Sequence, residues 1–137
     1  MFYPAKIRAD GASFLVTFRD IPEAITSGKS GRHAESMARD ALVTAMDFYF
    51  EDRRKVPPPS KPRRGEIAVP VAASVAAKVL LLNQMIDAGI TASELARKLN
   101  TSPQAVNRIV DIHHATKIDT IAAALQAMGR RLELSVA

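Results

Sequence analysis

Carboxylates are the side chains of this chain that could support metal-assisted chemistry. Metal-dependent cleavage of a phosphodiester needs several carboxylates that converge on divalent ions. Four candidates stand in the first half of the chain, namely Asp10, Asp20, Asp47 and Asp52. Asp10 is explained by a turn, and the five-residue interval between Asp47 and Asp52 is a poor spacing for one shared helix face. We therefore predict no catalytic residue, no metal site, no cofactor and no enzymatic activity.

Two adjacent histidines, His113 and His114, are a second candidate for metal chemistry. Neighbouring residues on a helix do not face the same way, and no third ligand lies close in sequence. We expect packing or phosphate contact from these side chains, and no metal.

A third group of polar side chains has the chemistry of DNA recognition. A glutamine can bond adenine with two hydrogen bonds, and an arginine can bond guanine in the same way. Gln104 and Arg108 follow Ser102, which can cap a helix, and Pro103, which suits its first position. The predicted buried stripe of that helix is Val106, Ile109 and Val110. Its predicted exposed face is Pro103, Gln104, Asn107, Arg108 and Asp111.

A preceding helix completes the pattern. Thr91 and Glu94 form a capping box, Ala96 is small where a second helix would cross, and Asn100 can end the helix in the left-handed conformation. The core positions of this helix are Leu95 and Leu99. Residues 91–110 therefore predict a helix-turn-helix, with an ordinary helical hairpin as the alternative. We expect Gln104 and Arg108 to read bases. The residues expected to place the DNA backbone are Ser102, Asn107 and Lys117, and Pro103 is the sixth residue predicted to bind DNA.

The first half of the chain supplies a strand–strand–helix–strand pattern. Residues 3–9 and 14–18 predict two strands, and Asp10-Gly11 between them predicts a hairpin turn. Ser30 can cap a long helix, and residues 66–69 predict another strand. The apolar stripe of the helix is Ala34, Met37, Ala38, Ala41, Leu42, Ala45, Met46 and Tyr49. The run Phe48-Tyr49-Phe50 is expected in the core.

Charge is unevenly distributed along a chain of net charge +5. Residues 20–52 hold seven acids and three bases, whereas residues 53–64 hold six bases and no acid. Four prolines between Pro57 and Pro62 exclude a helix, so residues 53–65 predict a connector. A solvated linker is the default for its basic run, residues 53–64, and contact with RNA or DNA phosphate is the alternative. This separation suggests two different partners. The acids expected to meet a basic protein surface are Asp20, Glu23, Asp47, Glu51 and Asp52, with a merely solvated face as the alternative.

The second half of the chain is predicted to be helical. Residues 71–88 form an amphipathic helix that Gly89 ends, and Thr116 with Asp119 suggests the cap of a last helix that ends at Gly129. The stripe of the 71–88 helix is Val75, Val79, Leu82 and Ile86, and that of the last helix is Ile118, Ile121, Ala122, Leu125 and Met128. Leu132, Leu134 and Val136 then alternate as in a strand. Because its edges would have no partner in a helical domain, we expect this strand to pair with a second chain.

Composition sets the class of protein. With 137 residues and 47% hydrophobic side chains, the chain can build one domain or two small ones. It has no cysteine, no signal-peptide pattern and no apolar run long enough to span a bilayer. We expect a cytoplasmic protein with no membrane partner.

Several short motifs, taken in order, resemble the HicB family of type II antitoxins, in the subgroup with a C-terminal helix-turn-helix. The motifs are residues 18–28, 40–42, 47–52, 79–83, 94–96 and 113–119. The resemblance covers essentially the whole chain. One departure from the family pattern lies at the start of the long helix, where His33 occupies the position of the acidic residue of a capping box. We therefore expect the first turn of this helix to fray.

The resemblance implies an α+β protein with two domains. Residues 1–69 would form a partial RNase H-like domain of order β-β-(β)-α-β that masks a small mRNA-cleaving HicA toxin. Residues 70–137 would bind operator DNA, repress the protein's own operon and dimerise, as a homodimer or a tetramer. Two other functions stay open: a metal-dependent RNase H-like nuclease, and a repressor whose first domain senses a small molecule.

Overall fold

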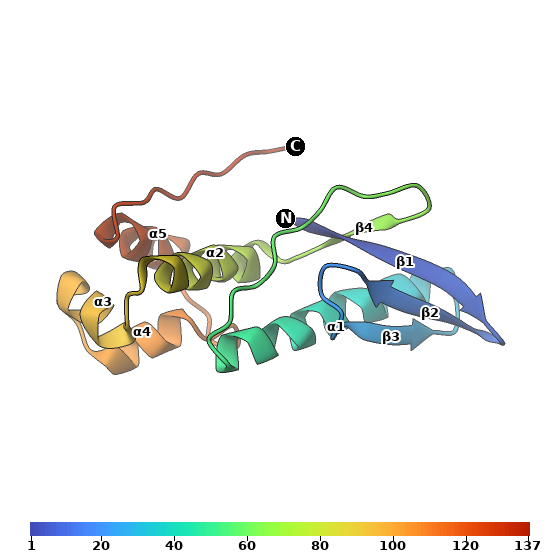
Figure 1. Cartoon of the computed structure of the whole chain (residues 1–137), viewed down its shortest axis with the longest axis horizontal. Coiled ribbons are helices and arrows are strands. Elements are labelled where there is room, and N and C mark those ends of the chain that lie inside the picture. Colours follow the sequence, from blue (N-terminus) through green and yellow to red (C-terminus); the bar gives the residue numbers. More distant parts are fainter. The chain divides into compact units, whose positions relative to one another are not determined.

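The structure, a computed structural model, describes residues 1–137 as an α+β chain of two compact units (Figure 1). The N-terminal unit consists of Met1–Glu51 with Val56–Ala72, and the helical unit consists of Asp52–Lys55 with Ala73–Ala137. The sequence-based boundary at residues 69 and 70 lies three residues earlier. Residues 53–55, which were predicted to belong to the connector, pack with the helices.

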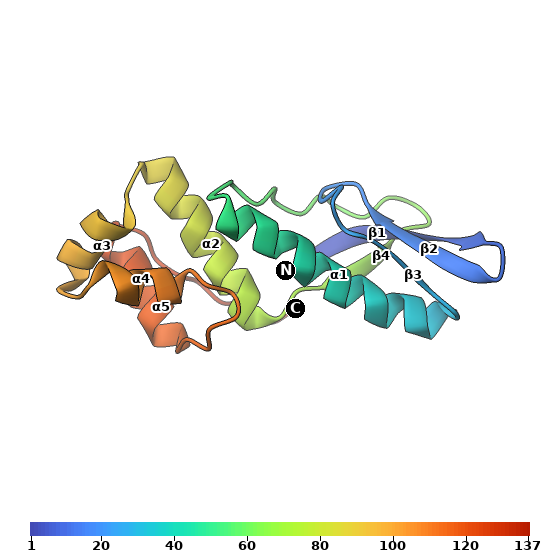
Figure 2. The same cartoon turned by 90° about the horizontal axis from the view of Figure 1, so that it is seen from below.

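The N-terminal unit is an antiparallel sheet with one long helix across one face (Figures 1 and 2). Its elements are β1 (Phe2–Asp10), β2 (Ser13–Phe18), β3 (Ile25–Gly28), α1 (Gly31–Glu51) and β4 (Ile67–Pro70). The strands lie in the order β3-β2-β1-β4. Asp10 pairs with Ser13, and Gly11 takes a φ of 62°, which confirms the hairpin. Glycine reaches this φ without strain because it has no Cβ.

The core of this unit lies between the sheet and α1. Ala5, Val16 and Phe18 alternate toward the helix and are fully or almost fully buried. Of the predicted α1 stripe, Ala34, Ala38, Leu42, Ala45, Met46 and Tyr49 are buried, and Met37 and Ala41 are partly buried. Phe50 is also buried, but Phe48 is 53% exposed, so its assignment to the core was wrong. Three consecutive helical residues spread over too wide an arc to share one buried face.

The start of α1 is capped, contrary to the expected fraying. The hydroxyl of Ser30 accepts a hydrogen bond from the His33 N–H at 3.1 Å. The Nδ1 atom of His33 accepts one from the N–H of Lys29 at 3.0 Å. The imidazole thus takes the acceptor role of the missing acid, one residue further back than in a standard capping box.

Most side chains of the predicted connector are exposed, but residues 56–61 are held on the N-terminal unit. Val56 is fully buried, and the hydroxyl of Tyr3 donates to the Pro57 carbonyl at 2.6 Å. Asp20 accepts from the N–H and the hydroxyl of Ser60, at 2.8 and 2.7 Å. The guanidinium of Arg19 donates to the Lys61 carbonyl. These bonds fix residues 56–61 against the unit.

Tyr3 makes the N-terminal unit sensitive to alkaline pH. Burial, with smaller contributions from Asp20 and Tyr49, raises the pKa of its phenol from 10.0 to about 12. Because the folded pKa lies above the unfolded one, the stabilisation is complete below pH 10 and is lost as the pH rises toward 12. We expect a loss of up to about 3 kcal/mol across this window. Denaturant unfolding at pH 8 to 12 measures it, and Tyr3→Phe should remove this part of the pH dependence. An equally steep loss in Tyr3→Phe would contradict the assignment.

The helical unit is built from α2 (Ala73–Ala88), α3 (Ala92–Leu99), α4 (Pro103–Ile109) and α5 (Ile118–Ala127). Gly89, with a φ of 64°, ends α2 as predicted. The buried core of the unit is Ala77, Leu81, Met85, Leu95, Ala96, Val106, Ile109, Val110, Ile121, Ala124 and Leu125. No single helix is long and apolar enough to cross a membrane. Only α2 and α3 taken together reach that length and composition, and the two helices are bent by 106° at the break between them.

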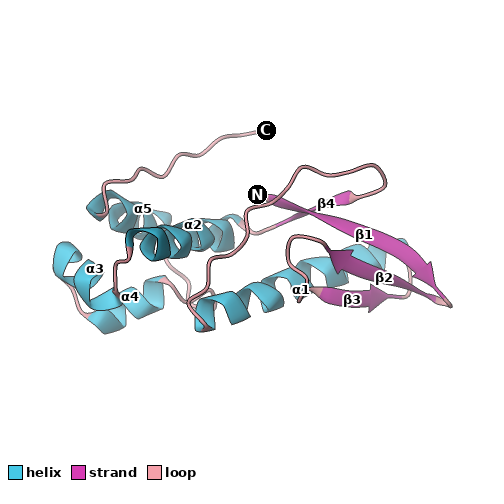
Figure 3. Ribbon diagram, in the orientation of Figure 1, coloured by secondary structure: helices cyan, strands magenta, loops and turns pink.

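Two predictions for the C-terminal segment differ from the structure. Lys117 occupies the cap of α5 with no side-chain cap bond, and the Thr116 hydroxyl instead donates to the His114 carbonyl. Residues 130–137 form neither strand nor helix (Figure 3). Leu132 packs on the helical core, whereas Leu134 and Val136 are 78% and 100% exposed. The single chain offers the tail no strand to pair with.

Candidate functional site

The turn between α3 and α4 is held by caps on both sides, as the sequence predicts. The N–H of Glu94 donates to the Thr91 hydroxyl at 3.2 Å, which caps α3. Asn100 ends α3 in the left-handed region, with φ 56° and ψ 48°. The hydroxyl of Ser102 accepts from the N–H of Ala105 at 3.1 Å, which caps α4. These local bonds fix where α4 begins and which way its faces point.

The α4 helix has one buried and one exposed face, and both agree with the prediction. Val106, Ile109 and Val110 are buried in the core. Gln104, Asn107 and Arg108 are exposed, next to the exposed Ser102 and Pro103. The structure thus gathers five of the six predicted DNA-binding residues on the start and outer face of one helix.

Asn107 has a hydrogen-bond partner that the sequence did not reveal. The guanidinium of Arg53 donates to its side-chain oxygen at 3.2 Å. Arg53 belongs to residues 52–55, which fold with the helical unit, and takes a positive φ of 53°. The basic side chain of Arg53 therefore lies beside the exposed face of α4.

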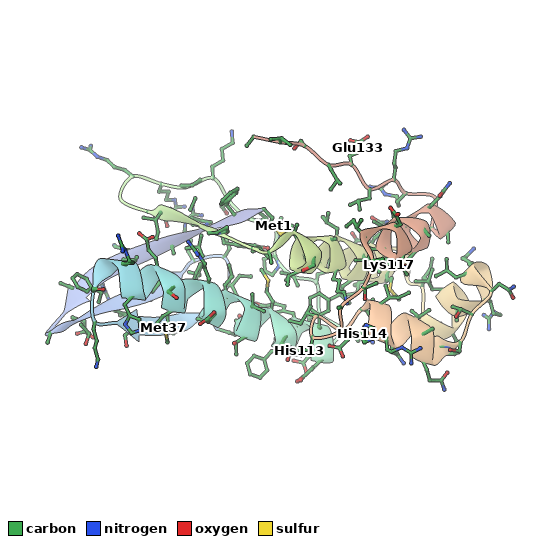
Figure 4. The ribbon with its side chains drawn as sticks, turned by 180° about the vertical axis from the view of Figure 1, so that it is seen from behind. Met1, Met37, His113, His114, Lys117 and Glu133 are labelled. Atoms are coloured by element: carbon green, nitrogen blue, oxygen red, sulfur yellow. The ribbon has the colours of Figure 1, made fainter.

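The sixth predicted residue, Lys117, lies on the segment between α4 and α5, together with His113 and His114 (Figure 4). All three are exposed. The His113 N–H donates to the Asp111 carboxylate at 2.9 Å, and that of His114 donates to the Asp111 carbonyl at 3.1 Å. The structure brings no three His, Cys, Asp or Glu side chains together in a way that could hold a metal ion.

A buried lysine positions this segment. Lys78 of α2 is 2% exposed, and its ammonium donates to the carbonyls of Asp111 and His114 at 2.6 and 2.5 Å. A longer contact of 3.4 Å reaches the carbonyl of Arg108, within α4. Burial lowers the pKa of Lys78, and the Asp111 carboxylate opposes that shift. A cation near a helix C-terminus also interacts favourably with the helix dipole.

Sequence reasoning missed Lys78, although a signal was present. Ala77, Lys78 and Val79 are consecutive in a strongly apolar helix, where a charged residue is out of pattern. Charged side chains are almost never fully buried unless they have partners. The partners lie 30 to 36 residues away, so the sequence could flag the residue but not its role.

The predicted toxin-binding acids divide into two groups, and the first comes from the loop after β2. Asp20 has a side chain that is only 12% exposed, and both of its oxygens bond Ser60. Glu23 accepts from the hydroxyl of Tyr49 at 2.6 Å, which joins this loop to α1. Both carboxylates thus hold the unit together.

The second group lies on or just after α1. Asp47 and Glu51 stand one turn apart on the helix, and Phe48 between them is exposed. Asp52 belongs to the helical unit and pairs with Arg54 at 3.4 Å. The structure therefore places Asp47 and Glu51 on one surface but does not bring all five predicted acids together.

Comparison with known proteins defines the class of protein to which this fold and these surfaces belong. Residues 2–80 match a family model described as the HicB-like antitoxin of bacterial toxin–antitoxin systems. Antitoxin HicB 2 of Photorhabdus laumondii is 56% identical over 98% of this chain and 95% of its own length. Antitoxin HicB of Escherichia coli K12 is 44% identical over 98% of both chains, and that of Pseudomonas fluorescens is 34% identical over 98% of this chain and 92% of its own.

The chain belongs to the HicB-like antitoxin family, and its function is that of an antitoxin with a toxin as its partner. The family model ends within α2, before the α3–α4 segment. The full-length relatives also cover that segment.

Proposed function

We propose that the two units divide the work of the antitoxin. The N-terminal unit, a partial RNase H-like domain, masks the active site of a HicA-type mRNA-cleaving toxin. The helical unit is a helix-turn-helix that binds operator DNA and represses the operon. The proposal of operator binding rests on the capped α3–α4 turn, because it exposes Gln104 and Arg108 while the opposite side of α4 is buried. The protein itself has a regulatory and not a catalytic role.

The exposed face of α4 has the residue types for both kinds of DNA contact. Gln104 and Arg108 would contact base edges in the major groove, where two-pronged hydrogen bonding distinguishes adenine and guanine. Ser102 and Lys117 would place the phosphate backbone, and Asn107, held by Arg53, would do the same. Exposed Pro103 lies at the start of the same face.

Arg108 and Lys117 give a paired test. We expect Arg108→Ala to cost roughly 1–3 kcal/mol of operator affinity and to relax base preference at one position of each half-site. Lys117→Ala should weaken all sequences alike and reduce the salt slope by about one. Gel shifts on matched and scrambled operators at several salt concentrations separate the two results. Unchanged affinity and preference in Arg108→Ala would mean that α4 does not read the operator.

A second copy of the chain completes the proposed DNA complex. Two helix-turn-helix units read half-sites one or more helical turns apart, about 34 Å for each turn. Leu134 and Val136 are exposed on a tail with no secondary structure. We propose that this tail pairs with its counterpart as a strand in the homodimer or tetramer, which would cover both side chains.

The surface of α1 that carries Asp47, Phe48 and Glu51 is the proposed docking site for the toxin. From Asp40 to the end of α1 there are three acids and no base. An RNA-cleaving toxin needs a basic surface for its substrate, so acids fit it by charge. An exposed aromatic ringed by polar groups has the anatomy of an interface hot spot.

Phe48 provides the test of toxin docking. We expect Phe48→Ala to weaken the toxin complex by about 2 kcal/mol, roughly 30-fold in Kd, because an anchoring ring is lost. Ile25 is 61% exposed on β3, so Ile25→Ala is a matched control that should leave binding unchanged. Calorimetry with a co-purified HicA-type toxin measures both. Loss of binding in Ile25→Ala with none in Phe48→Ala would place the toxin elsewhere.

A further inference from the structure

The sheet of the N-terminal unit has a basic face, on the side opposite α1. Strand residues alternate between faces, and Tyr3 and Ala5 of β1 are buried toward α1. Lys6 and Arg8 therefore point to the other side, where they pair across the ladder with Thr17 and Leu15. Both basic side chains are exposed.

The end of the connector adds further bases to this side. Arg63 and Arg64 line a surface hollow of about 350 Å³ together with Lys6, Thr17 and Arg19. Lys61 lies at the start of the same stretch and is exposed. Figure 4 shows side chains that end in nitrogen projecting from the stretch before β4. The basic face thus consists of Lys6, Arg8, Arg63 and Arg64, with Lys61 two residues before Arg63 in the chain.

Three acids lie near this face, and two of them, Glu66 and Asp20, are already bonded to other groups. Glu66 accepts from Arg19 through both oxygens, at 2.9 and 3.1 Å, and from the N–H of Arg63 at 2.6 Å. Its hydrogen bond with Arg19 lowers the pKa of Glu66, so it stays ionised and paired. Asp20 is bonded to Ser60. The side chains of Glu66 and Asp20 are only 11% and 12% exposed. Asp10, exposed on the same face at the hairpin end of β1, offsets one of the bases, so a surplus of positive charge faces water.

We propose that the basic face binds the phosphate backbone of duplex DNA beside the operator. The proposal rests on operator binding by the helical unit. Lysine and arginine side chains neutralise phosphates, and the arginine fork matches phosphate geometry. The buried side of α1 covers the other face of the sheet and its outer side carries the acidic surface, so a toxin docked there leaves the basic face open. Since the helical unit brings DNA to the same chain, tethering gives this second surface a high effective concentration of phosphate.

Salt dependence on two duplexes tests the proposal in the full chain. One duplex ends at the two half-sites, and the other extends about one and a half helical turns (~15 base pairs) beyond each. The variant is Lys6→Gln/Arg63→Gln/Arg64→Gln, and each lost phosphate contact lowers the slope of log K against log salt by about 0.9. We expect the slope to fall by about two to three on the long duplex and to stay unchanged on the short one. Base preference should not change.

A matched control removes the same charge from the helix side of the unit. Lys29, Arg32 and Arg39 are exposed at and near the start of α1, and Lys29→Gln/Arg32→Gln/Arg39→Gln should leave both slopes as in the wild type. Thermal unfolding of both variants shows whether the unit is intact. An unchanged slope on the long duplex, or the same fall in the control, would overturn the proposal. A variant that loses toxin binding and keeps its slope would make the basic face a protein-docking surface.

The test also separates this proposal from operator recognition. If the wild type does not distinguish operator from scrambled DNA, the helix-turn-helix function fails. Phosphate contacts need no base preference, so the slopes on the long duplex still decide whether the basic face binds DNA.

Discussion

Replacing Lys78 with methionine is expected to destabilise the helical unit by about 3 kcal/mol and to abolish specific operator binding. Methionine keeps the length and burial of the side chain but donates no hydrogen bond. The carbonyls of Asp111 and His114 then lose their partner, and a buried unsatisfied acceptor costs about 1–3 kcal/mol. Because these carbonyls belong to the segment between α4 and α5, α4, the helix proposed to read the operator, should lose its fixed orientation.

Denaturant unfolding combined with operator binding measures this effect. Lys98→Met is a suitable control because Lys98 is exposed on α3, and its unfolding midpoint should be close to that of the wild type. Toxin binding by Lys78→Met should persist, since the proposed toxin surface lies in the other unit. Wild-type unfolding and operator affinity in Lys78→Met would show that the buried ammonium does not support α4.

Gly28→Ala is expected to have the largest effect in the N-terminal unit. A Cβ at this position would lie 2.6 Å from the Cα of Ala34 and 2.9 Å from the carbonyl carbon of His33. Those atoms belong to the backbone of α1, so the helix would have to move away from β3. Overpacking of this kind costs about 3 kcal/mol, which corresponds to a fall of roughly 10–20 °C in the melting temperature of a unit of this size.

The chain offers a matched glycine for comparison. A Cβ at Gly31 would meet no atom within 4 Å, and Gly31 opens α1. Gly31→Ala should therefore be neutral or slightly stabilising. Calorimetric unfolding and toxin rescue in cells measure both variants. Equal stability of Gly28→Ala and Gly31→Ala would mean that β3 and α1 pack less closely than the distances around Gly28 indicate.

The features that sequence reasoning predicted are those that local chemistry determines. The Thr91 and Ser102 caps, the left-handed Asn100 and the glycine turns each depend on residues within four positions. The apolar stripes of α1 and α4 follow from helix periodicity alone. The face of α4 proposed to read DNA could therefore be predicted from the sequence.

The features that it missed depend on residues far apart in the chain. Asp20 looked like a surface acid because Ser60 lies 40 residues away. His33 looked like a lost cap because a histidine acceptor is not part of the usual pattern. The tail after Gly129 alternates like a strand, but a strand requires a partner that one chain does not contain.

One measurement tests the division of work between the two units most directly. Cells carrying the toxin and an operator-driven reporter would receive the wild type, Phe48→Ala or Arg108→Ala, at matched protein levels. We expect that Phe48→Ala fails to relieve growth arrest while still repressing the reporter, and that Arg108→Ala relieves arrest while losing repression. If either variant lost both activities while remaining folded, or if the two results were exchanged, the assignment of toxin masking and operator binding to separate units would be contradicted.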